Sequence, residues 1–470
     1  MAYTKNAIKA NNDAELLSYI INVTPELREE IDLPVQGESI APIGKIIVSN
    51  ERYKNAFLNT INLIGLTVID RVSWENPWRV FTDRGRLNFG QTVRELFVEM
   101  AKVYDYQSTV DNPTNFLTNV VPDVFSYLHE LNFQKYYKTT TSDEEIAMAF
   151  TEEGQLMDLI EKIVRSLYVG YEYDMYIVSK YMLCRRILDG TVTPVEIDGY
   201  GSLNSRERVS AIKNVSNLMT FLSPNYNPAG VHVASSFDDQ ILIMNTDFQA
   251  DYDTSVLATS YFMNEAQFKT NYALIDGFNN QDTARLIEVL GDQYVPFTET
   301  ELTALGNIPC VIIDRQWFQV YTYSLDNASD PAGDGTRRTT FFNPETLRNN
   351  HWLHAWKVFS TSPFMNAVVF TKDVTPNVSA ISVSPSTAEV LPGQSLKLTA
   401  AVTATGFANK AVAWSVASTT EGAKATIKQD GTLTIDPETP GQASFTVTAT
   451  SVYKDTVTGT ATVTTPAEES

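Results

Sequence analysis

A long helical pattern constrains this chain more than any other feature of its sequence. Ser142 and Glu145 have the spacing of a capping box, and Asp189 followed by Gly190 is typical of a helix end. Between these signals, apolar residues recur every three or four positions: Leu156, Ile160, Ile163, Leu167, Tyr171, Met175, Val178 and Met182. This spacing places them on one face of a single helix, which at about 1.5 Å per residue is on the order of 60 Å long. Such a helix predicts an elongated molecule built along one strut.

The composition changes at residues 372–379, a short linker that contains Pro376. Before the linker, helical and strand-like segments mix without regular alternation, which predicts an α+β fold. After it, large apolar residues alternate with small ones, as in NKAVAWSV at residues 409–416, and Asp430–Gly431 is typical of a hairpin turn. The sequence therefore predicts a separate all-β sandwich on a flexible linker. Its expected core is Leu398, Trp414, Ile427, Phe445 and Val447.

Two segments of the first part are expected to extend away from its core. Residues 1–50 are polar and interrupted by prolines, so they predict an N-terminal arm with one short helical patch at residues 13–23. Strand-like segments near residues 93–100 and 123–141 predict a long two-stranded ribbon. Such a ribbon is only marginally stable alone and needs another surface, such as a neighbouring subunit. We expect aromatic residues of this region to make that contact: Trp74, Trp78, Phe97, Phe125 and Tyr127.

Charge and cysteine content narrow the range of functions. The chain carries 35 Lys and Arg against 56 Asp and Glu, a formal net charge of −21, which disfavours tight binding of nucleic acid or anionic lipid. Cys184 and Cys310 form no CxxC motif, so buried free thiols are expected rather than a disulfide framework. The first residues do not read as a secretory signal, and no apolar run reaches 18 residues, so no membrane span is expected.

A few clusters of histidine, aspartate and arginine are candidates for metal-binding or contact sites. His351 and His354 would share a face on a helix, as metal ligands do, but no cysteine lies nearby. Asp247, Asp251 and Asp253 could supply oxygen ligands, yet the rest of a calcium loop is missing, so a solvated loop is expected. Arg337 and Arg338 form a small basic spot that predicts a surface or intersubunit contact. No phosphate-binding glycine loop and no GxSxG motif occurs, so we expect no catalytic residues, no cofactor and no metal.

The all-β tail, residues 380–466, resembles a bacterial immunoglobulin-like domain of group 2. The resemblance is carried by ISVSPSTAEVLPGQSLKLTAAVT, AVAWSV, DGTLTI, GQASFTVTAT and GTATVTT, in this order. It implies a module that binds or decorates rather than one that catalyses.

The rest of the chain resembles the major capsid proteins of phi-29-like short-tailed bacteriophages. The resemblance is carried by INLIGLTVIDRVSWENPW, ALIDGF, DRQWFQVY and HAWKVFSTSPFMNAVVFTKDV. It implies a Hong Kong 97-type capsid fold over residues 51–371, after an arm at 1–50 and before the linker at 372–379. The implied parts are an extended loop at about 70–141, a spine helix at about 142–189, an axial domain at about 200–323 and a return to the peripheral domain at about 350–371. The stretches at 279–304 and 326–340 look longer than in the family. No residue matches the lysine–asparagine cross-links of the Hong Kong 97 prototype.

This resemblance implies a structural function. The expected protein is a major capsid subunit that self-assembles, in the host cytoplasm, into the icosahedral shell around the double-stranded DNA of a tailed phage. Its implied partners are other copies in hexamers and pentamers, a scaffolding protein, the portal and, weakly, the packaged DNA, which the acidic charge would let slide past. The immunoglobulin-like domain is expected outside the shell, dispensable for it and able to reach a host-surface glycan. The alternative is a surface adhesin or carbohydrate-binding protein, which the lack of a recognisable secretory signal disfavours.

Overall fold

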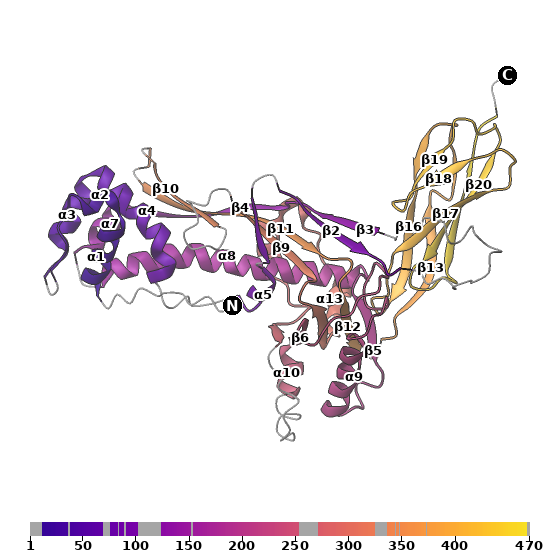
Figure 1. Ribbon diagram of the computed structural model, residues 1–470, viewed down its shortest axis with the longest axis horizontal. Helices are drawn as coiled ribbons and strands as arrows, with labels where there is room; N and C mark the ends of the chain where they lie inside the picture. The colour runs from indigo at the N-terminus through magenta and orange to yellow at the C-terminus, as the bar shows by residue number, and fades with distance from the viewer. Residues whose placement is uncertain are drawn as a thin grey trace, which may run out of the picture.

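The protein is described here from a computed structural model, which has one elongated subunit with a separate sandwich at one end (Figure 1). The structure describes residues 12–467, except for 36–37, 69–75, 83, 89–90, 102–123, 152–153, 253–270, 325–335, 344, 347 and 373. A group of short helices lies at the opposite end of the long axis, and one long helix, α8, runs from this group toward the sandwich (Figure 1). The described buried apolar side chains form a main core, a smaller one and a separate core inside the sandwich.

The segment expected to be an N-terminal arm is instead packed into the main core, where it is described. Helices α1 (Asp13–Val23), α2 (Pro25–Arg28) and α3 (Ala41–Ser49) precede α4 (Glu51–Val68). The apolar face of α1 is fully buried, and the hydroxyls of Thr24 and Thr60 lie 2.7 Å apart between α1 and α4. The prolines mislead because Pro25 stands at the start of α2, where proline is tolerated. Short amphipathic helices are stable here because they share one core.

The long helix begins later than the sequence predicts. The capping box of Ser142 and Glu145 is present, but it begins the short helix α7 (Asp143–Ala149). Helix α8 (Gln155–Leu188) follows after Gly154, whose φ of 90° breaks the helical path. The backbone N–H of Gly154 donates to Asp13 Oδ2 at 2.7 Å, which ties this break to α1. The 34 residues of α8 span about 50 Å, so the strut itself is present.

A five-stranded sheet lies along α8. Its order is β1 (Gly85–Asn88), β9 (Phe318–Ser324), β11 (Arg348–Thr361) and β10 (Thr336–Asn343), with β4 (Phe133–Ser142) also paired to β11. The prediction of one long ribbon strand at 123–141 was therefore partly wrong, because the later half of this segment forms β4, which pairs with β11 in this sheet. The reason is burial: Tyr137 packs edge-on against Tyr171 of α8, with ring centroids 5.9 Å apart. Strand β10 also replaces the end of the loop expected at 326–340.

A second sheet of five strands forms the smaller core and extends the main one. Its order is β5 (Thr193–Ile197), β12 (Ala367–Lys372), β8 (Cys310–Asp314), β6 (Gln240–Asn245) and β7 (Tyr272–Ile275). The helices around it include α9 (Ser205–Leu218), α10 (Thr246–Tyr252), α12 (Thr283–Leu290) and α13 (Glu299–Gly306). The chain thus crosses between the two sheets. Strand β9, most of which falls in the range expected for the axial domain, belongs to the first sheet, and β12, most of which falls in the range expected for the return to the peripheral domain, belongs to the second. The polar stretch at 279–304 contains α12 and most of α13, whose N-termini are capped by Asp282 and Thr298.

The C-terminal sandwich has its own core. Its strands are β13 (Asn377–Ser384), β14 (Thr387–Glu389), β15 (Ser395–Lys397), β16 (Thr399–Thr405), β17 (Val412–Ser418), β18 (Ala425–Ile427), β19 (Thr432–Ile435), β20 (Ser444–Ser451) and β21 (Thr458–Thr464). Leu398, Trp414, Phe445 and Val447 are buried in this core, and Ile427 packs against it while partly exposed. Asp430–Gly431 makes the turn between β18 and β19, with Gly431 at φ 85°.

Candidate assembly site

A two-stranded ribbon is the most exposed apolar element among the described residues. Strands β2 (Val93–Val98) and β3 (Val124–His129) pair with each other in antiparallel register, from Val93 opposite His129 to Val98 opposite Val124. They extend along the molecule toward the sandwich (Figure 1). Because successive residues of a strand point to opposite sides, the ribbon has an inner and an outer face.

The inner face binds the ribbon to its own subunit. His129 is 1% exposed; its Nδ1 lies 2.8 Å from Ser360 Oγ and its Nε2 lies 3.2 Å from Glu95 Oε2. Ser362 Oγ donates to the other oxygen of Glu95 at 2.7 Å. Beyond the end of β2, Glu99 Oε1 lies 2.7 Å from His232 Nδ1. The contacts of this face with Ser360, Ser362 and His232 thus form a clasp that holds the ribbon on its own subunit.

The outer face is exposed and largely apolar, with Arg94 and Ser126, which are hydrogen-bonded to each other at 3.2 Å, as its polar part. Leu96 and Val98 are each 58% exposed, and Val124 and Leu128 on the partner strand are 54% and 48% exposed. Their cross-strand positions place all four on one side of the ribbon, and Met100 continues the same parity at 53% exposure. An exposed, largely apolar surface of this kind on a folded subunit marks an interaction site rather than a solvated face.

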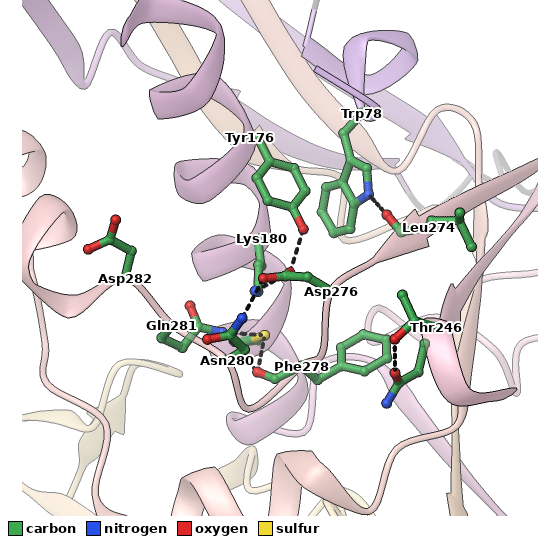
Figure 2. A network of polar contacts seen from close by, with 12 residues as sticks. Trp78, Tyr176, Lys180, Thr246, Leu274, Asp276, Phe278, Asn280, Gln281 and Asp282 are labelled. Atoms are coloured by element: carbon green, nitrogen blue, oxygen red, sulfur yellow. Dashed lines mark hydrogen bonds and ion pairs between the residues drawn. The ribbon is translucent and has the colours of Figure 1, made fainter. Parts of the chain in front are cut away.

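The aromatic residues expected at an intersubunit contact have different fates. Trp78 is fully buried in the subunit's own core, where its indole Nε1 donates to the carbonyl of Leu274 at 2.8 Å (Figure 2), so it was wrongly assigned to a contact. Trp74 lies outside the described residues. Phe97 stacks on Phe364 with ring centroids 5.8 Å apart. Phe125 and Tyr127 are 40% and 36% exposed on the inner side. The outer residues Leu96, Val98 and Leu128 were missed, although the period-two alternation of VRELFV could have revealed Leu96 and Val98.

A polar network fixes the second sheet to α8 (Figure 2). Asp276, just after β7, accepts hydrogen bonds from Tyr176 Oη at 2.6 Å and Lys180 Nζ at 2.5 Å through Oδ1, and from Asn280 Nδ2 at 2.7 Å through Oδ2. The side chain of Lys180 is only 4% exposed, so the ion pair with Asp276 offsets the cost of burying it. Burial, and then the hydrogen bond to Asp276, raises the pKa of the Tyr176 phenol. All these groups serve one another, so the network positions elements rather than a substrate.

The structure does not bring the described candidate metal ligands together as a site. His351 and His354 stand in strand β11, not a helix, so a spacing of three turns them to opposite faces. Asp251 in α10 accepts from Ser205 and pairs with Arg208 at 3.1 Å, while Asp247 is exposed and Asp253 lies outside the described residues. Among the residues that the structure describes, no group of three His, Cys, Asp or Glu side chains is placed to hold a metal ion.

The arginine pair and the two cysteines are part of the fold itself. Arg337 and Arg338 belong to β10 and pair with β11. Cys184 and Cys310 are buried free thiols, and burial raises the pKa of both, that of Cys184 to about 12. Within the described part of the chain, no helix combines the length and the apolar character that crossing a membrane requires.

Comparison with known proteins agrees with the two parts of the fold. Residues 19–371 match the family model of the Phi29-like phage major capsid protein, and residues 377–464 match that of the bacterial Ig-like domain, group 2. The major capsid protein of Bacillus phage B103 is 28% identical over 443 residues, which cover 92% of this chain and 88% of that protein. The major capsid protein of Bacillus phage PZA is 29% identical over 420 residues, which cover 88% of this chain and 84% of that protein.

A solved structure overlaps the chain more loosely. A chain of the capsid of Staphylococcus phage Andhra aligns with a TM-score of 0.45 and 15% identity, over 65% of this chain and 86% of that one. The family model, by contrast, spans most of the sequence, from the second half of α1 through the ribbon and α8 to Thr371 in β12. The chain therefore belongs to the Phi29-like phage major capsid protein family and is a shell subunit of a tailed-phage virion.

Proposed function

We propose that the outer face of the β2–β3 ribbon is the contact through which one subunit lies on the next in the shell. The observation that supports this is the row of exposed apolar side chains at Leu96, Val98, Val124 and Leu128, on a strand pair whose other face is already bound to its own subunit. If a neighbouring subunit covered this face, the apolar surface removed from water would stabilise the contact by about 25 cal/mol per Å². The clasped inner face would hold the ribbon in position before the neighbour arrives.

In this proposal the subunits form hexamers and pentamers, with a scaffolding protein and the portal taking part in assembly. The formal charge of −21 supports a weak, non-specific relation to packaged DNA, because like charges keep the phosphate backbone at a distance. The protein acts by assembly, without catalysing a reaction. A surface adhesin is not favoured, because the capsid family model covers residues 19–371.

We also propose that the immunoglobulin-like domain lies on the outside of the shell and contacts a host-surface glycan. Its place at one end of the subunit, with a core separate from that of the capsid part, supports a module that can stand apart from the shell wall (Figure 1). Protease treatment of intact particles tests this: digestion of sandwich loops on whole heads is expected, and full protection until the heads are broken would contradict an external position.

The ribbon proposal is tested by substituting the outer face. The double variant Leu96→Glu and Val98→Glu is expected to fold, because both side chains are exposed, but to form few shells, since buried unpaired carboxylates oppose the contact. Leu391→Glu in the sandwich is the matched control, at 59% exposure against 58% for Leu96. Shells are counted by electron microscopy after co-expression. If the double variant assembles as well as the control, the ribbon contact is refuted.

A further inference from the structure

The sandwich touches the capsid part at the C-terminal end of α8. Gly190, with φ 73°, follows this helix, and a Cβ atom there would lie 2.5 Å from Asn409 Cα and 2.6 Å from the carbonyl oxygen of Ala408. These distances are below those of real contacts and involve backbone atoms, which cannot swing away. Only glycine at position 190 allows this approach. The joint loop, residues 406–411 between β16 and β17, therefore lies directly against the end of the spine helix.

The joint loop places an aromatic side chain in the capsid part. Phe407 has φ 60°, a conformation that residues with a side chain adopt at a cost, and its ring packs against the main capsid core rather than the sandwich core. Ala408 beside it is fully buried. Strained backbone persists where the surrounding packing holds it, so the docking of Phe407 is the contact that stabilises this loop.

The linker is held on the sandwich side of the same joint. Gly406, with φ 61°, leaves no room for a Cβ atom, which would lie 2.8 Å from Pro376 Cα. The hydroxyl of Tyr453 donates to the carbonyl of Pro376 at 3.2 Å, and Lys454 Nζ donates to Asn377 Oδ1 at 3.3 Å. Strand β13 begins at Asn377, so the expected flexible linker is in part a strand. A cavity of about 690 Å³ beside the joint has walls from both sides, including Leu188, Ala304 and Phe407.

We propose that the immunoglobulin-like domain is a fixed extension of α8, held by docking of the joint loop against Gly190, so that this joint and not the linker sets its orientation. The surface at Gly190 is covered by the chain's own sandwich. This joint would form in the same way with or without the ribbon contact, and on either side of the shell. It replaces the freely swinging module that the linker composition predicts.

The test is limited trypsin digestion of the full-length subunit, with cleavage after Lys372 followed by mass spectrometry. Gly190→Ala is expected to raise this cleavage rate about tenfold, because an opened joint exposes the linker. Gly291→Ala is the matched control: Gly291 also ends a helix with a positive φ, of 56°, but has nothing within 4 Å of its Cβ position. The nicked wild-type fragments are expected to co-elute in gel filtration, and those of Gly190→Ala to separate.

A second variant removes the dependence on how Gly190→Ala folds. Phe407→Ala leaves the end of α8 unchanged and is expected to raise cleavage after Lys372 in the same way, whereas Leu391→Ala, at an exposed site of the same domain, is expected to leave the wild-type rate. Equal cleavage rates in wild type, Gly190→Ala and Phe407→Ala would overturn the proposal. So would separation of the nicked wild-type fragments.

Discussion

His351 shows how burial of a single side chain contributes to the pH dependence of subunit stability. It is fully buried in β11, where Nε2 lies 2.9 Å from Thr141 Oγ1 of β4 and Nδ1 lies 3.3 Å from Thr340 Oγ1 of β10. Burial lowers the pKa of His351 to about 4 from the 6.5 of an exposed imidazole. The folded subunit therefore keeps this ring neutral at pH values where the unfolded chain is protonated.

This pKa shift predicts a loss of stability in acid. Between pH 6.5 and pH 4 unfolding takes up a proton at His351, so the free energy of unfolding falls as the pH falls, by about 3 kcal/mol in total. Above pH 6.5 both states are neutral there and this contribution is fully present. His351→Gln should flatten this part of the curve, measured by denaturant unfolding at several pH values. Equal slopes in wild type and His351→Gln would refute the assignment.

Trp78 and Trp414 illustrate a limit of reading residues from sequence. Both are buried, but only for Trp414 does the neighbouring sequence predict this. The alternation of large and small residues around Trp414 has a period of two and assigns its side chain to the inner face of a strand. Trp78 stands outside any periodic segment, just before α5 (Arg79–Thr82), and its burial depends on a carbonyl 196 residues away at Leu274. No local pattern contains that contact.

At the level of elements, the ribbon is an arm that its own subunit holds by one face. The clasp uses few groups, and His129 is at its centre, between Glu95 of β2 and Ser360 of β11. Because the described side chains of the outer face are exposed in the subunit, the hydrogen bonds of the inner face decide whether the ribbon is ordered before assembly.

His129→Ala is therefore expected to loosen the ribbon without unfolding the subunit. Removing both hydrogen bonds of a buried imidazole costs about 1–3 kcal/mol, so amides of β2 and β3 should exchange on the order of 10- to 100-fold faster. Hydrogen exchange read by mass spectrometry gives the measurement, with α9 as the internal reference, since it lies in the other part of the fold. Unchanged protection of β2 and β3 would mean that the clasp does not hold the ribbon.

The sequence predicted elements well where one pattern is local, and poorly where partners are distant. The α+β fold followed by an all-β immunoglobulin-like sandwich is confirmed, and the capsid family model matches residues 19–371. The helix at 13–23 was predicted with its bounds, and the capping box at Ser142 was correct. The exit of β4 from the ribbon was missed because its partner β11 lies more than 200 residues away. The helix break at Gly154 was missed because one glycine between the capping box and the apolar repeat that begins at Leu156 does not by itself predict a break.

At the scale of the whole molecule, the subunit combines two folding units that touch at one joint. The sandwich core contains Trp414, at 7% exposure, and shares no buried residue with the main capsid core around Trp317, at 1% exposure. Each unit should then unfold around its own core, with the joint adding a limited coupling between them.

Trp414→Ala is expected to destabilise the sandwich alone. Truncating a buried tryptophan costs about 3–5 kcal/mol, a large share of the stability of a small domain. In calorimetry of the full-length subunit, the transition of the sandwich should move down strongly while that of the capsid part changes little. Trp317→Ala should give the reverse pattern. A single transition that moves by the same amount in both variants would show that the two cores are not independent.

The parallel pairing of β5 with β12 has a consequence for synthesis on the ribosome. Strand β5 ends at Ile197, but its hydrogen-bonding partner begins at Ala367, and β12 is also the strand that joins β5 to β8. A nascent chain elongating at about 5–20 residues per second needs about 10–35 s to make the roughly 170 residues between them. During that interval β5 has no partner, so the sheet cannot close. Completion of the capsid part is thereby linked to the arrival of its last strand, and a truncated translation product lacks the closed sheet.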